Sequence, residues 1–160
     1  MKKDAAKAVK ITIRRFRDSD SKALSSLIVK TLRTTSSKYY QKRFIEYFVR
    51  RRSPKALKEL SGKTTIFVAL CGKRIVGTVN LSPIGGVGSM FVHPGFQSRK
   101  VGSKLVRYLL RQAKKRKLKR VRGNSAINAV DFYRKLDFKV GRKTVYKKKF
   151  VTYRVTYVLK

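Results

Sequence analysis

Apolar and polar residues follow two different periods along this chain, and each period predicts one kind of element. A two-residue alternation, or a short run rich in β-branched residues, is typical of strands. It predicts strands over Ile11–Phe16, Thr64–Cys71, Arg74–Leu81, Val87–Val92, Arg120–Ser125, Lys143–Lys147 and Val151–Leu159. Gly72-Lys73 fits a two-residue hairpin turn, and residues 83–86 fit the turn before the fourth strand.

Apolar residues spaced by three and four predict the helices between these strands. They mark one through Leu24, Leu27, Ile28 and Leu32, a second with Tyr40, Phe44, Tyr47 and Phe48 after a break at Thr34–Ser37, a third ending at Gly62, a long one from Val101 past Ala113, and a short one over Asn128–Leu136. Asp18 or Ser19 can cap the first helix, and Ser53-Pro54 starts the third with an N-cap and a first-turn proline. The mixed order of elements predicts an α/β fold.

The segment from Ser89 to Ser103 is the most informative part of the chain. Pro94 ends the apolar strand because it has no N–H to donate, and helical spacing begins at Val101. A strand, a tight turn and a helix N-terminus bring several unpaired N–H groups together at the positive end of the helix dipole. Such an arrangement binds phosphate. The alternative is an ordinary strand-to-helix turn.

Three segments resemble the GNAT N-acetyltransferases, in the family's order. Val92-His93-Pro94 followed by residues 97–105 (Gln-Ser-Arg-Lys-Val-Gly-Ser-Lys-Leu) is similar to the family's acyl-CoA loop. Residues 132–138 (Phe-Tyr-Arg-Lys-Leu-Asp-Phe) are similar to its F-Y-x-K-x-G-F segment, and residues 13–20 to its opening strand. The resemblance implies a single GNAT domain over residues 1–160, with residues 1–10 as a disordered N-terminal segment. It also implies a mixed, mostly antiparallel central sheet flanked by helices.

Two residues depart from the family's pattern. Lys100 stands where the loop has its first glycine, and Asp137 replaces the glycine of the G-F pair. Glycine allows positive φ, which would cost a lysine about 1 kcal/mol. We expect helical φ at Lys100, which would bring its charge toward a pyrophosphate, and left-handed φ at Asp137, since Asp tolerates that conformation after a helix.

The resemblance also implies a cofactor site. In the family, the fourth and fifth strands splay apart and the pantetheine arm pairs with the fourth strand. N–H groups of the loop hold the pyrophosphate, and an N–H near Val92 faces the thioester oxygen as it becomes an oxyanion. The cofactor-binding residues implied for this chain are Phe91, Val92, Gln97, Ser98, Arg99, Lys100, Val101, Gly102, Ser103 and Asn128.

Tyr133 matches the family's tyrosine that gives a proton to the departing CoA thiolate; the alternative is a core aromatic beside Phe132. The family often has asparagine seven residues earlier, where this chain has Ala126, so Asn124 or Asn128 would supply that contact. No carboxylate lies on the strands over residues 64–81 and 87–92, and we interpret His93 as a neutral turn residue. Water or a backbone carbonyl would then take the acceptor's proton.

The charge of the chain is its outlying property. Forty-three Lys and Arg against seven Asp and Glu give +36 over 160 residues, which predicts non-specific binding of polyanions. The alternative is a solvated face set by composition. A basic stripe runs along the central helix at Lys100, Lys104, Arg107, Arg111 and Lys114–Lys115. The single cysteine, Cys71, fits a reducing compartment and a small core residue. No metal site, secretory signal or membrane span is predicted.

These observations favour an acetyl-CoA-dependent N-acetyltransferase that moves an acetyl group directly from the thioester to a primary amine. The alternative is a strongly basic nucleic-acid-binding protein on a GNAT scaffold, with weak or no transferase activity. The expected partners are acetyl-CoA, an amine acceptor on a small molecule or protein, non-specific polyanions including nucleic acid, and a second copy of the chain in a homodimer. We expect a cytoplasmic protein.

Overall fold

The computed structural model describes residues 9–146 and 150–160. Strands are β1 (Thr12–Arg15), β2 (Thr65–Cys71), β3 (Arg74–Leu81), β4 (Val87–Val92), β5 (Arg120–Ala126), β6 (Lys139–Tyr146) and β7 (Phe150–Val158). Helices are α1 (Ser21–Thr34), α2 (Lys42–Arg50), α3 (Pro54–Ser61), α4 (Val101–Lys115) and α5 (Val130–Lys135). Short 3-10 turns lie at Asp18–Asp20, Ser36–Lys38, Pro94–Phe96 and Ile127–Ala129.

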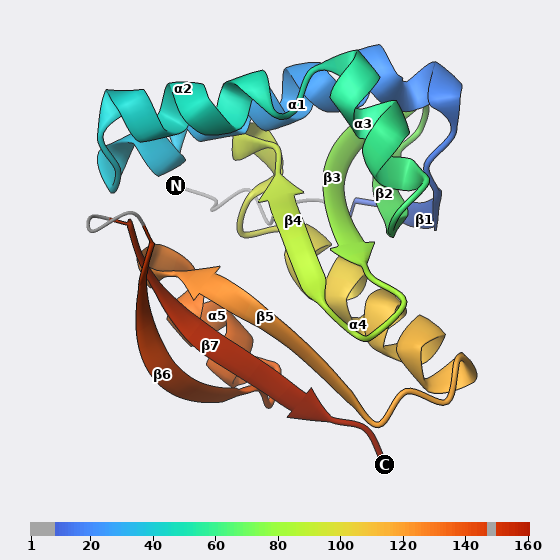
Figure 1. Cartoon of the computed structure of the whole chain (residues 1–160). Helices are drawn as coiled ribbons and strands as arrows, with labels where there is room; N and C mark the ends of the chain where they lie inside the picture. Colours follow the sequence, from blue (N-terminus) through green and yellow to red (C-terminus); the bar gives the residue numbers. More distant parts are fainter. Residues whose placement is uncertain (1–8, 147–149) are drawn as a thin grey trace, which may run out of the picture.

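The strands form two antiparallel sheets. One has the order β1-β2-β3-β4 and the other the order β5-β7-β6. Helices α1, α2 and α3 cover one face of the first sheet, and α4 lies on the other (Figure 1). This is the mixed, mostly antiparallel α/β architecture predicted from the sequence, so that prediction is confirmed.

The core has two parts because β2 buries side chains on both faces. Successive strand residues point to opposite faces. Ile66 and Val68 pack with α1 and α3, whereas Phe67 and Ala69 pack with α4 and the second sheet. Both groups are almost fully buried. The first sheet is therefore packed on both faces, with β4 at its edge.

Within the described residues, the two sheets are bridged near the start of β4 and then part. Gly86 bridges to Arg122 in parallel, and the Arg122 N–H donates to the Gly85 carbonyl at 2.9 Å. A side chain at Gly123 would collide there, because its Cβ would lie 2.5 Å from Val87 Cγ1. Farther along, β5 pairs with β7 instead. The ribbons of β4 and β5 diverge toward α1 and α2, as Figure 1 shows.

Several element boundaries differ from the prediction. α1 begins at Ser21, so Asp18 and Ser19 do not cap it; they belong to the 3-10 turn before it. Asp20 accepts hydrogen bonds from Arg14 at 2.7 and 3.0 Å and from the Arg17 N–H at 2.8 Å. The sixth strand starts four residues before the predicted Lys143, because Lys139 and Val140 pair with β7. Residue 147, at its predicted end, and residues 1–8 of the predicted N-terminal segment lie outside the described residues.

Other local predictions are confirmed. Ser53 caps α3 by accepting the Ala56 N–H at 3.1 Å, with Pro54 as the first helical residue. Cys71 pairs with Arg74 across the Gly72-Lys73 turn. Within the described part of the chain, none of the helices is both long and apolar enough to cross a membrane.

Candidate active site

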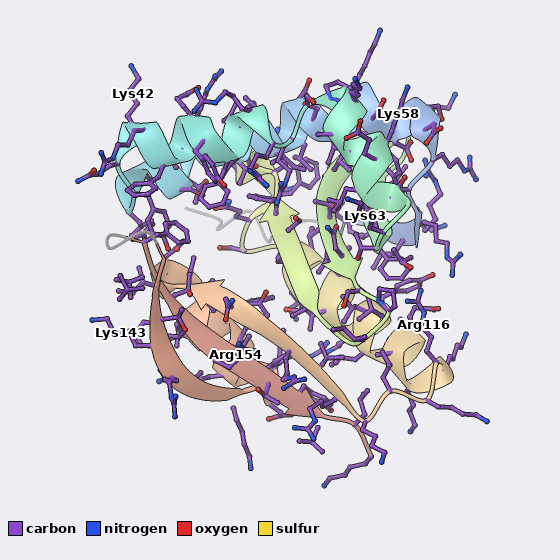
Figure 2. All side chains as sticks on the ribbon, viewed as in Figure 1. Lys42, Lys58, Lys63, Arg116, Lys143 and Arg154 are labelled. Atoms are coloured by element: carbon purple, nitrogen blue, oxygen red, sulfur yellow. The ribbon has the colours of Figure 1, made fainter. Side chains whose placement is uncertain are left out.

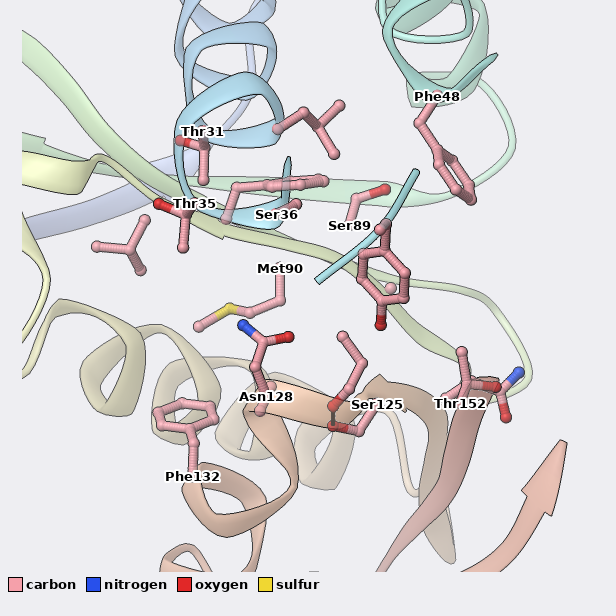
Figure 3. A pocket seen from close by; sticks show the side chains of 18 of the residues that line it. Thr31, Thr35, Ser36, Phe48, Ser89, Met90, Ser125, Asn128, Phe132 and Thr152 are labelled. Atoms are coloured by element: carbon pink, nitrogen blue, oxygen red, sulfur yellow. Dashed lines mark hydrogen bonds between the residues drawn. The ribbon is translucent and has the colours of Figure 1, made fainter. Parts of the chain in front are cut away.

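A cavity of about 320 Å³ lies in the cleft where the sheets part. Its walls come from the C-terminal end of α1, from α2, from β4, and from β5, α5 and β7. Figure 3 shows Thr31, Thr35 and Ser36 on one side and Ser125, Asn128 and Phe132 on the other, with Met90 between them. The further lining side chains that bear on function are Arg52, Gln97, Asn124 and Tyr133. Residues that are far apart in the sequence, from Thr31 to Thr152, thus line one cavity.

Strand β4 bulges where it borders this cavity. Thr78 pairs with Phe91 and Asn80 with Gly88, so Val79 alone faces two residues of β4. One of these two, Ser89, has φ of 48°. A bulge bends the strand and leaves its extra residue out of the ladder. The bulge therefore directs main-chain groups and the Ser89 hydroxyl into the cleft.

Val92 presents its main chain to the cleft. The His93 N–H donates to the Val76 carbonyl at 2.8 Å, and Val92 stands opposite Gly77. Residues of an antiparallel strand alternate between facing the neighbouring strand and facing away, so the N–H and C=O of Val92 point away from β3. Its carbonyl accepts the Gln97 amide at 3.2 Å. The Val92 N–H stays on the open edge of β4, where the family resemblance implies an oxyanion donor.

The loop from Gln97 to Lys100 turns the chain into α4 through two left-handed residues. Ser98 has φ of 62° and Lys100 has φ of 64°. The expectation of helical φ at Lys100 is therefore wrong: Lys100 lies outside the helix as its N-cap, where the chain reverses. Left-handed φ at Asp137, after α5, is confirmed at 66°. The first N–H groups of α4 have no partner within the helix, so the geometry that binds phosphate is present.

Gly102 lies against the cavity wall. A Cβ at this position would come within 3.0 Å of Met90 Cε and 3.2 Å of the Phe132 ring. A side chain would therefore displace two lining residues as well as crowd a ligand at the loop. Nearby, the Arg99 guanidinium lies over the Phe96 ring, 5.6 Å from its centroid. Gln97 also donates to the Thr35 hydroxyl at 3.2 Å and so ties the loop to α1.

Tyr133 is buried at the floor of the cleft. It lies between the rings of Phe132 and Phe138, with centroid distances of 5.1 and 5.2 Å. Burial raises the pKa of its hydroxyl to about 12. Within the described residues this hydroxyl makes no hydrogen bond. It is a core aromatic, as one interpretation had it, and its protonated hydroxyl lies at the cavity wall, where the other interpretation places a proton donor.

The neighbours of Tyr133 include both asparagines that could replace the one missing at Ala126. Asn124 and Asn128 line the same cavity, and Figure 3 shows the Asn128 amide facing into it. His93 lies outside the cavity lining and caps a 3-10 turn by accepting the Gly95 N–H at 2.9 Å. Its pKa is lowered by burial and by the charges of Arg74 and Lys30. His93 is thus a neutral turn residue, as interpreted.

Comparison with known proteins identifies the family to which this fold belongs. The family model described as "Acetyltransferase (GNAT) domain" matches residues 28–157. The chain belongs to the GNAT acetyltransferase family. Comparison with curated proteins gives no match.

Solved structures support the assignment at the level of the fold. A GCN5-related N-acetyltransferase from Rhodopseudomonas palustris superposes on this GNAT domain with a TM-score of 0.84 at 18% identity, covering 92% of this chain and 95% of that one. The PaiA N-acetyltransferase of Thermoplasma acidophilum, solved with coenzyme A, gives 0.81 at 18% identity and covers 94% and 99%. yncA of Salmonella typhimurium, solved with its cofactor acetyl-CoA, gives 0.65 at 17% and covers 94% of both chains.

The cavity of this GNAT domain contains one charged residue that sequence reasoning missed. Arg52, in the connection between α2 and α3, is the only Lys, Arg, Asp, Glu or His among the lining residues of the described chain. Its guanidinium donates to the Ser89 hydroxyl at 3.0 Å and to the Arg51 carbonyl at 3.2 Å. No sequence pattern marked it, because Arg50, Arg51 and Arg52 form a run in which any one could turn inward.

The other basic side chains of this GNAT domain cover its outside. Figure 2 shows Lys42 and Lys58 projecting from the helical layer, and Lys143 and Arg154 projecting from the second sheet. All residues of the basic stripe are exposed: Lys100, Lys104, Arg107, Arg111, Lys114 and Lys115. The described residues hold no cluster of His, Cys, Asp and Glu that could bind a metal ion.

Proposed function

We propose that the protein transfers an acetyl group from acetyl-CoA to the nitrogen of a primary amine. The observation that carries this proposal is the free main-chain edge of β4 at Val92, which lies beside the α4 N-terminus and across the cleft from Tyr133. A thioester held along that edge has a phosphate-binding loop at one end and a protonated phenol near its sulfur. The family match and the cofactors of two structural neighbours support the same chemistry.

The chain offers one group for each part of CoA. The main chain of Val92 faces the pantetheine arm, and Gln97 shares this edge through its bond to the Val92 carbonyl. Phe91, which the family resemblance also implied, stands opposite Thr78 and directs its N–H and C=O toward β3, so it offers the cofactor no main-chain group. The N–H groups of Ser98 to Ser103 hold the pyrophosphate, because a helix N-terminus favours anions. Arg99 and Lys100 add positive charge at the same loop. Asn128 contacts the cofactor from the opposite wall.

The reaction needs no covalent enzyme intermediate. The amine nitrogen forms a bond to the carbonyl carbon of the thioester, and the carbon–sulfur bond then breaks. Negative charge builds on the carbonyl oxygen during attack, and the Val92 N–H stabilises it as a fixed donor in a site that excludes water. The sulfur leaves with the electron pair of the broken bond and receives a proton, whereas the nitrogen loses one. Atoms and charges therefore balance.

Tyr133 acts first as a hydrogen-bond donor to the departing sulfur. A pKa near 12 makes the phenol a weak acid, so full transfer to a free thiolate of pKa ~8.5 would be uphill by about 5 kcal/mol. A thiolate formed in the same buried cleft also has a raised pKa, which narrows this gap. The phenol stays protonated at every physiological pH, so it can donate a hydrogen bond to the sulfur throughout that range.

The amine must lose its proton without a carboxylate or histidine base. No such residue lines the cavity in the described chain. Positive charge around the cleft lowers the pKa of an ammonium group, so the neutral amine binds more readily than it would near acids. Once the neutral amine has attacked, its nitrogen must release one further proton. Water at the mouth of the cleft, or a main-chain carbonyl of β4, accepts that proton.

The direct test is to incubate the purified protein with acetyl-CoA and a panel of primary amines. Release of the CoA thiol and the mass of the acetylated amine are followed together. Thiol release with an acetylated product supports the proposal. Thiol release without such a product shows hydrolysis only and contradicts N-transfer. Binding of CoA without turnover of any amine contradicts the transferase assignment.

A further inference from the structure

Arg52 is a partly buried cation without an acidic partner among the described residues. The described residues form three ion pairs, Arg14–Asp20, Arg33–Glu46 and Arg134–Asp131, and none includes Arg52. Its Nε is buried and has no hydrogen-bond partner. Burial is also the main cause of the lowered pKa of its guanidinium. Desolvating a charge and leaving a donor unpaired both cost free energy, so this arrangement is unfavourable without a ligand.

The surroundings hold Arg52 in place rather than let it turn to solvent. The Ser25 hydroxyl of α1 donates to the Arg52 carbonyl at 2.7 Å, which fixes the backbone. The guanidinium then reaches β4 and donates to Ser89 at its bulge. Ser89 in turn has an unfavourable left-handed conformation. A positioned cation and a strained strand thus meet at the wall of the cleft that α1, α2 and β4 form.

We propose, on the basis of the transferase function above, that the acceptor is a small amine bearing a carboxylate, and that Arg52 binds this carboxylate. A guanidinium presents a planar fork of donors that matches a carboxylate in a bidentate pair. One cation among hydroxyls such as Thr31 and Ser36 suits a single negative charge. The cavity volume of about 320 Å³ lies at the lower end of small-molecule sites, and the acetyl thioester occupies part of it, so only a small acceptor fits beside the cofactor.

This assignment also fits the charge of the whole protein. A +36 surface repels polyamines but not a zwitterion, whose net charge is zero. Binding the carboxylate supplies the counter-ion that Arg52 lacks. The ammonium group of the same molecule then lies in a cationic environment, which favours its loss of a proton.

The experiment compares amino acids with amines that lack only the carboxylate. The pairs are alanine with ethylamine, β-alanine with ethylamine, 4-aminobutyrate with propylamine, and phenylalanine with phenethylamine. Rates are expressed per concentration of unprotonated amine, so that differences in amine pKa cancel. At least one pair should show kcat/KM tenfold or more higher for the amino acid. Equal values in all pairs would overturn the proposal.

Variants link that preference to Arg52. Arg52→Met should remove the preference and raise KM for the amino acid tenfold or more, whereas Arg52→Lys should keep part of it. The control is Arg51→Met, because Arg51 is exposed and stacks on Tyr47 outside the cavity lining. A preference that persists in Arg52→Met would overturn the proposal. So would a loss of CoA affinity in that variant with the preference unchanged.

A binding measurement separates this proposal from the transferase function itself. The Nε–Hε NMR signal of Arg52, assigned by its disappearance in Arg52→Met, is followed while alanine, 4-aminobutyrate or phenylalanine is added with CoA present. A shift that saturates, and that the matched amine does not cause, supports carboxylate binding even if turnover is absent. Turnover of amines without any such shift would leave the transferase function intact and overturn the role of Arg52.

Discussion

Lys100 and Lys117 have the same left-handed backbone conformation at opposite ends of α4, with φ of 64° and 58°. Lys117 follows the helix, where its N–H donates to the Lys114 carbonyl at 2.9 Å. Lys100 precedes it, at the loop that we assign to the pyrophosphate. The same conformation therefore occurs at a helix end and at the proposed pyrophosphate loop. Variants at the two lysines can distinguish the effect of backbone strain from the effect on ligand binding.

Replacing either lysine by glycine should relieve this strain. A left-handed non-glycine residue costs about 1 kcal/mol, so Lys100→Gly and Lys117→Gly should each raise the free energy of unfolding by up to about 1 kcal/mol. Only Lys100→Gly should weaken CoA binding, by several-fold, because it removes a charge at the loop. Chemical denaturation and calorimetry measure the two effects. Equal loss of CoA affinity in both variants would contradict the placement of the pyrophosphate.

The Arg14–Asp20 pair should contribute to stability in a pH-dependent way. Two hydrogen bonds from Arg14 are the main cause of the lowered pKa of Asp20, whose side chain is only 10% exposed. The ionised carboxylate therefore stabilises the fold above its unfolded pKa of about 3.9. Asp20→Asn should lower the free energy of unfolding by about 1–3 kcal/mol at neutral pH. The difference from wild type should shrink as pH falls through the lowered folded pKa.

The matched control for this pair is Asp131→Asn. Asp131 pairs with Arg134 at 3.1 Å, but both side chains are mostly exposed. An exposed ion pair contributes little, so this variant should differ from wild type by less than about 1 kcal/mol at any pH. Urea denaturation at neutral and acidic pH compares the two variants. A loss in Asp131→Asn as large as in Asp20→Asn would show that burial is not what gives the Arg14 pair its strength.

A substitution at Gly102 tests whether the cavity wall and the loop both contribute to the cofactor site. Gly102→Val should weaken acetyl-CoA binding well over tenfold, because a side chain there meets Met90 and Phe132 as well as the ligand. Gly141→Val serves as control on β6, where the nearest atoms to an added Cβ are 3.7 and 3.8 Å away. Calorimetric titration with CoA compares them. Unchanged affinity in Gly102→Val would remove the loop from the cofactor site.

Tyr133 should act without titrating in the usual pH range. Tyr133→Phe should lower kcat by roughly ten- to a thousandfold, near the range for a general acid, with little change in acetyl-CoA affinity. Because the raised pKa of about 12 keeps the phenol protonated, the wild-type rate should not fall between pH 7 and about pH 10 through loss of this proton. Tyr157→Phe is the control, since Tyr157 stacks on the same Phe138 from outside the cavity lining. Wild-type turnover in Tyr133→Phe would refute the assignment.

The contrast between Asp137 and Lys100 shows which features sequence reasoning could reach. Asp137 directly follows a helix of apolar period, and a left-handed residue is common at that position. Lys100 precedes its helix, and its φ depends on how the chain returns from Ser98 and the end of β4, which no local pattern records. Arg52 is farther from prediction still, because it meets Ser89 across 37 residues of sequence. Local periods predicted the elements, whereas the contact between Arg52 and Ser89 depends on how distant elements pack.

The surface charge should act on CoA mainly through residues near the loop. At about 0.15 M salt the Debye length is ~8 Å, and Lys114 lies ten helical residues beyond Lys104, or about 15 Å along the axis. Association of CoA should therefore slow steeply as salt rises, and Arg99→Gln or Lys104→Gln should slow it further at physiological salt. Lys114→Gln should slow it only at low salt.

RNA or heparin should compete with CoA, because the same charges attract any polyanion. Stopped-flow association across a salt series measures these rates, and a rate independent of salt would mean that the basic side chains form a solvated coat with no part in cofactor capture.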